Sequence, residues 1–270
     1  MSAQSLDFLT PDWPAPAHVR ALFTLRAGGV SRPPYDSLNL GDHVGDSFQA
    51  VAANRAALEQ RLNAGQGARP TVKPVFLSQV HGTQVVKLDV NTPDATVADA
   101  CLSTQCGLAC TIMVADCLPV LLTDETGSFV AAAHAGWRGL AGHEGRGVLE
   151  SVFGSFLAET KYPLASEASK TIVWLGPCIG SEAFEVGPEV RAAFVSHDAL
   201  ASACFKALIA GKWLCDLQGL ARQRLQALGV TQIFGNDGSI DWCTVSNPSR
   251  FFSHRRDRVS GRMAACIWLA

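Results

Sequence analysis

The fold is decided by residues 108–134, which read LACTIMVADCLPVLLTDETGSFVAAAH. Three apolar runs of about strand length, over 108–115, 118–123 and 128–134, follow one another with no helical pattern between them. The last two are separated by Asp-Glu-Thr-Gly, a stretch that predicts a hairpin turn. Consecutive strands of this kind favour an α+β fold over a regular alternation of strands and helices.

The rest of the chain adds elements of both kinds around this stretch. Further strands are expected over 19–26, 75–80, 84–89, 171–175, 231–234 and 263–269. Helices are expected over 47–62, 145–158, 188–195 and 217–228, with Ser47 and Asp216 as N-caps of the first and last. The most linker-like piece, residues 63–70, is short enough to be a loop. We therefore expect one α+β domain over residues 1–270.

Composition excludes several classes of protein. Of the 270 residues 48% are hydrophobic and 17% charged, which predicts a folded chain with a sizeable core. A net charge of −2 gives no indication of nucleic-acid binding, and no apolar run is long enough to span a membrane. The first residues show no secretory signal, and the nine cysteines are an odd number. We expect a cytoplasmic protein with reduced thiols.

Three reactive side chains lie at breaks in apolar strands. His81 precedes Gly82, Cys117 lies two residues before Pro119, and His134 lies two residues before Gly136. Two imidazoles and one thiolate suit Zn²⁺, and three protein ligands leave a fourth position open for catalysis. Zinc lowers the pKa of a bound water to about 7. The spacing alone leaves other readings open: ordinary hydrogen-bonded histidines, or a cysteine nucleophile with a histidine base.

The same donor set is also that of a blue-copper site, which usually adds a weak axial methionine. No methionine follows Cys117 on the same loop, so copper is less favoured than zinc.

Two further residues are candidates for the chemistry. On the helix expected over 47–62, Arg55 shares a face with apolar residues and points inward. A buried guanidinium needs an anion, which could be a substrate phosphate or a carboxylate of the chain itself. Glu185, an acid in an apolar context, is a candidate general acid or base, with a surface acid as the alternative.

These stretches together resemble the laccase-domain or polyphenol-oxidase-like family, which includes a peptidoglycan editing factor and purine nucleoside phosphorylases. The match spans from about residue 20 to the end of the chain, and the stretches that carry it are 34–41 (PYDSLNLG), 79–82 (QVHG), 115–120 (ADCLPV), 134–139 (HAGWRG), 175–180 (LGPCIG), 184–187 (FEVG), 252–257 and 261–263 (GRM). The resemblance implies mixed central β-sheets flanked by helices and a zinc site made by His81, Cys117 and His134.

The resemblance also implies an activity. We expect a zinc-dependent enzyme that phosphorolyses adenosine, inosine and methylthioadenosine and deaminates adenosine, with purine nucleoside and phosphate as substrates and with Cys117, Arg55 and Glu185 as catalytic residues. One alternative is an amidase-type hydrolase that removes wrongly incorporated amino acids from muramyl precursors, with Cys117 as nucleophile. Another is a non-enzymatic structural zinc protein, which a fourth ligand such as Asp116 would favour.

Overall fold

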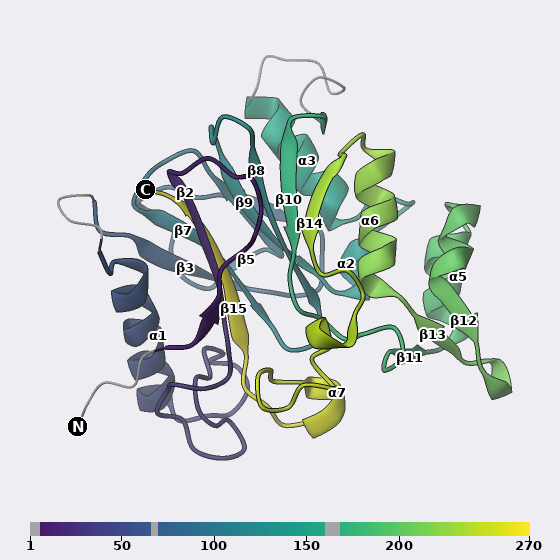
Figure 1. The fold of residues 1–270 in the computed structure, drawn as a ribbon, viewed down its shortest axis with the longest axis horizontal. Helices are drawn as coiled ribbons and strands as arrows, with labels where there is room; N and C mark the ends of the chain where they lie inside the picture. The colour runs from purple at the N-terminus through teal and green to yellow at the C-terminus, as the bar shows by residue number, and fades with distance from the viewer. Residues whose placement is uncertain (1–5, 66–69, 160–167) are drawn as a thin grey trace.

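A computed structural model describes residues 6–65, 70–159 and 168–270, and it is built around two six-stranded sheets (Figure 1). The first sheet has the order β1 (Phe8–Leu9), β2 (Val19–Thr24), β15 (Met263–Leu269), β7 (Leu108–Val114), β3 (Lys73–Ser78) and β5 (Thr96–Val97). The second has the order β14 (Gln232–Gly235), β10 (Thr171–Leu175), β8 (Leu118–Asp124), β9 (Val130–Ala135), β6 (Ala100–Ser103) and β4 (Val85–Lys87). A small third sheet joins β11 (Glu185–Val186), β13 (Trp213–Cys215) and β12 (Phe205–Ala207).

Helices cover the outer faces of the two large sheets. On the first sheet lies α1 (Phe48–Leu62). On the second lie α2 (Trp137–Ala141), α3 (Val148–Glu159), α5 (Pro188–Val195) and α6 (Leu217–Ala227), while the short α7 (His254–Asp257) precedes β15. Single 3₁₀ turns occur at Ala199–Cys204, Ile209–Gly211 and Ile240–Trp242. The predicted α+β class, with mixed sheets flanked by helices, is confirmed.

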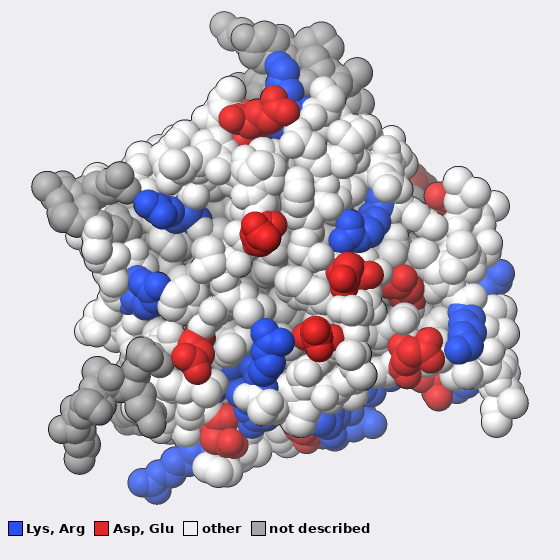
Figure 2. All heavy atoms as spheres, in the orientation of Figure 1, with Lys and Arg blue, Asp and Glu red and all other residues white. Residues whose placement is uncertain are grey.

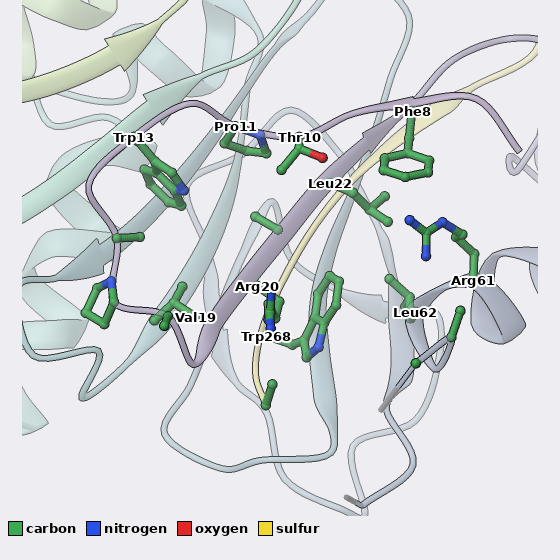
Figure 3. A pocket seen from close by; sticks show the side chains of 17 residues that line it. Phe8, Thr10, Pro11, Trp13, Val19, Arg20, Leu22, Arg61, Leu62 and Trp268 are labelled. Atoms are coloured by element: carbon green, nitrogen blue, oxygen red, sulfur yellow. The ribbon is translucent and has the colours of Figure 1, made fainter. Parts of the chain in front are cut away.

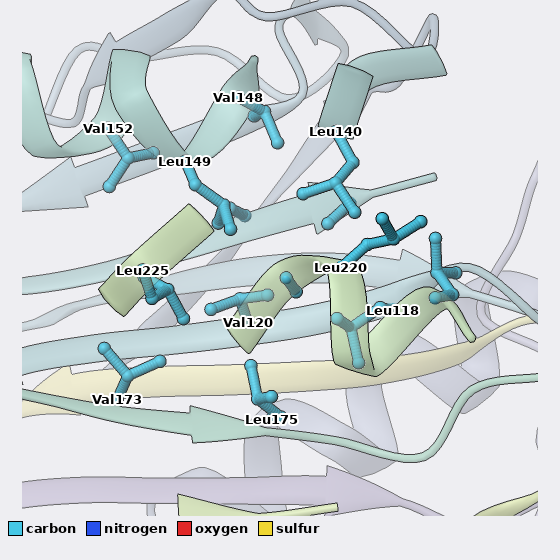
Figure 4. Close-up of a cluster of buried hydrophobic side chains, with 14 of the residues drawn as sticks. Leu118, Val120, Leu140, Val148, Leu149, Val152, Val173, Leu175, Leu220 and Leu225 are labelled. Atoms are coloured by element: carbon cyan, nitrogen blue, oxygen red, sulfur yellow. The ribbon is translucent and has the colours of Figure 1, made fainter. Parts of the chain in front are cut away.

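Apolar side chains fill each interface between these layers. Phe23 of β2 and Trp174 of β10 meet between the sheets, with their ring centroids 6.4 Å apart. Between the second sheet and its helices, Leu149 of α3, Leu220 of α6 and Val120 of β8 belong to one buried cluster (Figure 4). The strands β7, β8, β9 and β15 are buried along their whole length, because both sides of each sheet are covered.

The chain crosses from the first sheet to the second three times at one edge. Strands β5, β3 and β7 are parallel neighbours, so their carboxyl ends lie together. Each is followed by a short connection, over residues 98–99, 79–84 and 115–117 respectively, and then by a strand of the second sheet. Residues that are far apart in the sequence therefore meet at this edge.

Most predicted elements form close to their expected bounds. Ser47 caps α1 by accepting from the Ala50 amide, and Asp216 caps α6 by accepting from the Gly219 amide. The helix predicted over 145–158 starts at Val148, because the chain first makes a tight turn in which the His143 and Arg146 backbones pair. The short strands β1, β5, β6, β11, β12 and β13 and the five-residue α2 were not predicted. Across the described residues, no helix has the length and apolar character needed to cross a membrane.

Candidate active site

The crossing edge brings His81, Cys117 and His134 together. His81 lies on the connection after β3, Cys117 on the connection after β7, and His134 near the end of β9. One ligand atom from each residue lies within 4.8 Å of the other two. The Sγ atom of Cys117 is 3.7 Å from Nε2 of His81, and the two imidazole rings meet edge to face at 4.7 Å. The structure thus gathers the three residues that the sequence proposed as one set.

A buried carboxylate organises two of these three residues. Asp99, which is fully buried, lies 2.8 Å from Nδ1 of His134 through Oδ1, so that Nε2 of this ring is left for the cluster. The same carboxylate accepts the backbone N–H groups of Val80, His81 and Gly82 at 3.1, 2.9 and 2.6 Å. It therefore fixes the ring of one ligand and the backbone of the other, including the positive φ of 61° at His81.

The separation of Cys117 and His81 can be compared with that of two ligands on one tetrahedral ion. Zinc holds an imidazole nitrogen at about 2.1 Å and a thiolate sulfur at about 2.3 Å, so two such atoms on one ion lie about 3.6 Å apart. The Cys117–His81 separation of 3.7 Å matches this value. Among the described residues, no fourth histidine, cysteine or carboxylate joins the cluster. The nearby Asp116 carboxylate is already engaged, since it accepts from the Thr244 hydroxyl and the Arg255 amide, each at 2.6 Å.

The cluster is also polarised without a metal. Burial raises the pKa of the Cys117 thiol, but the adjacent His134 and His81 outweigh burial and lower this pKa to about 6. Burial lowers the pKa of His134, but Cys117 and Asp99 outweigh it and raise this pKa to about 9. Near neutral pH the metal-free pair is therefore a thiolate beside an imidazolium. A thiolate is the form that binds a metal or acts as a nucleophile.

The cluster opens into a cavity of about 460 Å³ with a cationic wall. Four arginines, one carboxylate and several apolar side chains line it: Arg138, Arg255, Arg258, Arg262, Asp116, Trp137, Ile179, Phe184 and Leu217. With four arginines and one carboxylate in its lining, the cavity carries an excess of positive charge. Elsewhere, on the face drawn in Figure 2, basic and acidic side chains are interspersed. The cavity suits a substrate with an anionic group beside an apolar one.

Arg55 and Glu185 lie outside this lining. Arg55 does face inward from α1, but its Nε donates to the Leu40 carbonyl at 2.9 Å and its Nη2 pairs with Asp42 at 3.2 Å. The guanidinium also stacks on Phe76, 4.0 Å from the ring centroid. This arrangement corresponds to the internal carboxylate partner that the sequence left open.

Glu185 has an exposed side chain on β11, and its backbone carbonyl accepts from Arg255 at 3.0 Å.

Sequence reasoning missed Asp99 and Arg262 as site residues. Asp99 occupies a two-residue crossing between β5 and β6, inside the apolar run Val97-Ala98-Asp99-Ala100. An acid surrounded by apolar residues was the signal that singled out Glu185, and it applied here as well. Arg262 was noted only as part of the GRM stretch.

Comparisons with known proteins agree with this architecture. A family model described as multi-copper polyphenol oxidoreductase laccase matches residues 20–270. A purine nucleoside phosphorylase of Pseudomonas aeruginosa is 48% identical over 264 residues, which cover 97% of this chain and 98% of the relative. A purine nucleoside phosphorylase of Escherichia coli is 49% identical over 261 residues, with coverage of 97% and 98%.

Solved structures show the same likeness. A Neisseria meningitidis protein superposes with a TM-score of 0.82 at 44% identity, covering 97% of this chain and 98% of that one. A hypothetical protein of Bacillus licheniformis superposes with a TM-score of 0.83 at 28% identity, covering 100% and 98%. The resemblance inferred from the motifs is confirmed. The chain belongs to the laccase-like family described as multi-copper polyphenol oxidoreductase laccase.

Proposed function

We propose that this chain is a zinc-dependent purine nucleoside phosphorylase that acts on adenosine, inosine and methylthioadenosine and also deaminates adenosine. The observation that carries the proposal is the three-residue His–Cys–His cluster opening into a cavity with arginines on its wall. The names of the two relatives described above support the same substrate class.

The lining of the cavity includes a group suited to each part of these substrates. Trp137 and Phe184 present rings against which a purine base could pack. The arginines supply positive charge for phosphate, which must be held beside the ribose carbon that it attacks. His81, Cys117 and His134 would hold zinc, which when bound supplies a Lewis acid and activates water for deamination. Because Asp99 fixes both histidines, the ligands are preorganised for the ion.

We propose zinc rather than copper, in spite of the family's description. The part of the chain that the structure describes contains one cluster of three potential ligands, whereas a multi-copper enzyme needs several centres. A blue-copper site usually has an axial methionine. Met113 lines the same cavity, but its sulfur accepts from Nη2 of Arg55 at 3.9 Å. The N₂S set with an open position is that of catalytic zinc.

The test combines metal analysis with product analysis. The purified protein should contain about one zinc ion per chain. With adenosine and phosphate it should release adenine and ribose 1-phosphate, and with adenosine alone it should release inosine. Cys117→Ala should lose the zinc and both activities. A protein that contains zinc but turns over none of the three nucleosides would refute the proposal.

The lowered pKa of Cys117 favours a second candidate function. A thiolate beside a histidine can attack an amide carbonyl, so the chain would be an amidase that edits muramyl precursors. This candidate predicts that muramyl-serine cleavage occurs in the metal-free protein and is lost in Cys117→Ala. Cleavage that requires zinc, or no cleavage beside rapid nucleoside turnover, would exclude it.

The third hypothesis, a non-enzymatic protein with a structural zinc site, has less support than the two enzymes. Asp116, the fourth ligand considered for it, has both carboxylate oxygens in hydrogen bonds to Thr244 and Arg255.

A further inference from the structure

Arg262 lies at the crossing edge, directly before β15. Met263, the first residue of that strand, pairs with Val114, the last residue of β7, which leads into the connection that carries Cys117. Arg262 lines the same cavity as Cys117 and His134. The side chain is therefore placed to meet a ligand that reaches the His–Cys–His cluster.

The backbone and stem of Arg262 are fixed by residues 39–41, the end of the PYDSLNLG stretch. The fully buried Asn39 accepts the Arg262 N–H at 2.8 Å through Oδ1, and the Leu40 N–H donates to the Arg262 carbonyl at 3.1 Å. Gly41 makes room for the stem, because a Cβ atom there would lie 2.7 Å from Cγ of Arg262. Two stretches that the proposed function leaves unused, 34–41 and 261–263, thus meet to position one guanidinium.

The Cys117 thiolate and the Asp116 carboxylate of the same cavity act on the charge of Arg262, but only from a distance. Its Nη1 donates to the carbonyls of Ser260 and Gly261 at 2.9 and 3.1 Å, and it forms no ion pair with any described carboxylate. Two other half-buried arginines do have a carboxylate in contact: Arg224 pairs with Glu150 at 2.9 Å and Arg256 with Asp257 at 2.6 Å. A half-buried guanidinium with no carboxylate in contact loses hydration without full compensation, and an anion that binds it directly reduces this cost in free energy.

We propose that Arg262 is the residue that binds inorganic phosphate, the co-substrate of phosphorolysis, beside the metal cluster. This inference rests on the proposed function. The planar guanidinium presents its free N–H groups to two phosphate oxygens, while Nη1 stays held by the two carbonyls. Arg55, which already has Asp42, is not needed for this role.

The experiment is steady-state kinetics of the zinc-loaded enzyme with phosphate and nucleoside varied separately. Arg262→Gln should raise the KM for phosphate by about 10- to 100-fold and leave the KM for inosine within about twofold. Arg262→Lys, which keeps the charge but loses the fork, should have a smaller effect. The control is Arg20→Gln, which removes an arginine from a different cavity and should change neither constant.

A second variant keeps the assignment testable if Arg262→Gln does not fold. Gly41→Ala keeps the guanidinium in the chain but displaces its stem, so it too should raise the KM for phosphate. Unchanged phosphate KM values in a folded Arg262→Gln, or in Gly41→Ala if the former does not fold, would overturn the assignment.

Calorimetric titration with inorganic phosphate separates this inference from the proposed function. Phosphate binding that is lost in Arg262→Gln, in a wild-type protein without phosphorolysis, would keep the site and reject the function. Phosphorolysis with a phosphate KM independent of Arg262 would keep the function and reject the site. A wild-type protein that neither binds phosphate nor phosphorolyses nucleosides would reject both.

Discussion

Two cavities of nearly equal size, about 460 and 450 Å³, differ in the reactive groups that line them. The first contains the His–Cys–His cluster and the cationic wall. The second lies between the N-terminal segment, the end of α1 and the outer side of β2 and β15 (Figure 3). Phe8, Trp13 and Trp268 line it beside Arg20 and Arg61, and no described residue of its lining is a histidine, cysteine, aspartate or glutamate.

The difference between the cavities follows from how each is built. The first lies where three strands leave one sheet for the other, so short connections display polar groups from a rigid frame. The second is a gap left where a segment and a helix end cover one sheet incompletely. Size alone does not identify a functional site, whereas convergent groups with shifted pKa values do.

The largest contrast between the cavities should appear in catalysis. If the proposed function holds, Cys117→Ser should lower kcat for phosphorolysis on the order of a thousandfold, because it removes the thiolate that we propose as a metal ligand. Trp13→Leu, in the second cavity, should leave kcat within about twofold. Equal losses in both variants would mean that the second cavity also takes part in the reaction.

Metal affinity should depend on the carboxylate behind the ligands. Asp99→Asn should weaken zinc binding by about 10- to 100-fold in a chelator competition, because the amide cannot accept from all the groups that Asp99 serves. The matched control is Asp124→Asn, another buried carboxylate, which holds Thr126 and Ser128 in a turn. This variant should lower the melting temperature without changing zinc affinity.

Thiol reactivity should have an unusual pH dependence. With its pKa lowered to about 6, Cys117 in the metal-free protein is a thiolate above that pH and a thiol below it. Its alkylation rate should therefore rise between about pH 5 and 7 and then level off, whereas an ordinary thiol still rises through about pH 8.5.

His134→Gln removes the main favourable charge and should move the midpoint upward, toward that of an ordinary thiol. A midpoint that stays near 6 would show that His134 is not its cause.

Zinc affinity should also depend on the absence of a side chain at Gly136, which lies against the cluster. Gly136→Ala places a Cβ atom 2.9 Å from both Sγ of Cys117 and Cδ2 of His81, so the ligands must shift. We expect about a tenfold loss of zinc affinity. Gly154→Ala, in the middle of α3 with open space around it, should instead raise the free energy of unfolding by about 0.5–1 kcal/mol.

The smallest effect is expected in the second cavity. The indole Nε1 of Trp268 is buried there without a hydrogen-bond partner. Trp268→Phe removes this donor at the expense of some packing, so the free energy of unfolding in denaturant should change by less than about 1 kcal/mol. Phosphorolysis should not change. A large loss of activity would contradict the view that this cavity is a packing gap.

Local signals explain what the sequence could predict. Ser47 and Asp216 mark the starts of α1 and α6, and the long strands β7, β8 and β9 follow from their apolar runs and the turn between the last two. The inward direction of Arg55 was also predicted from its spacing to Val51, Leu58 and Leu62. These three residues are buried, as expected for one helix face. These features depend on neighbours within a few residues.

The rest depends on contacts across the chain. A strand pattern does not say which sheet a strand joins, so the crossings that bring His81 and Cys117 together could not be read from it. The strand β5 has two residues and β6 has four, too few for a period, and Asp99 between them was overlooked. The counterion of Arg55 lies on a loop thirteen residues before it, where no helix spacing could place it.

The three crossings also set where this chain can change in length. Connections 98–99 and 115–117 are too short to absorb an inserted residue. An insertion in the first would turn Asp99 away from the cluster, and an insertion in the second would turn Cys117 away. At the opposite edge the chain returns to the first sheet through 88–95 and 104–107 and turns within the second sheet through 125–129, and these connections hold none of the cluster residues. Engineered fusions, tags or peptide insertions should therefore be tolerated at that far edge while the chemistry survives.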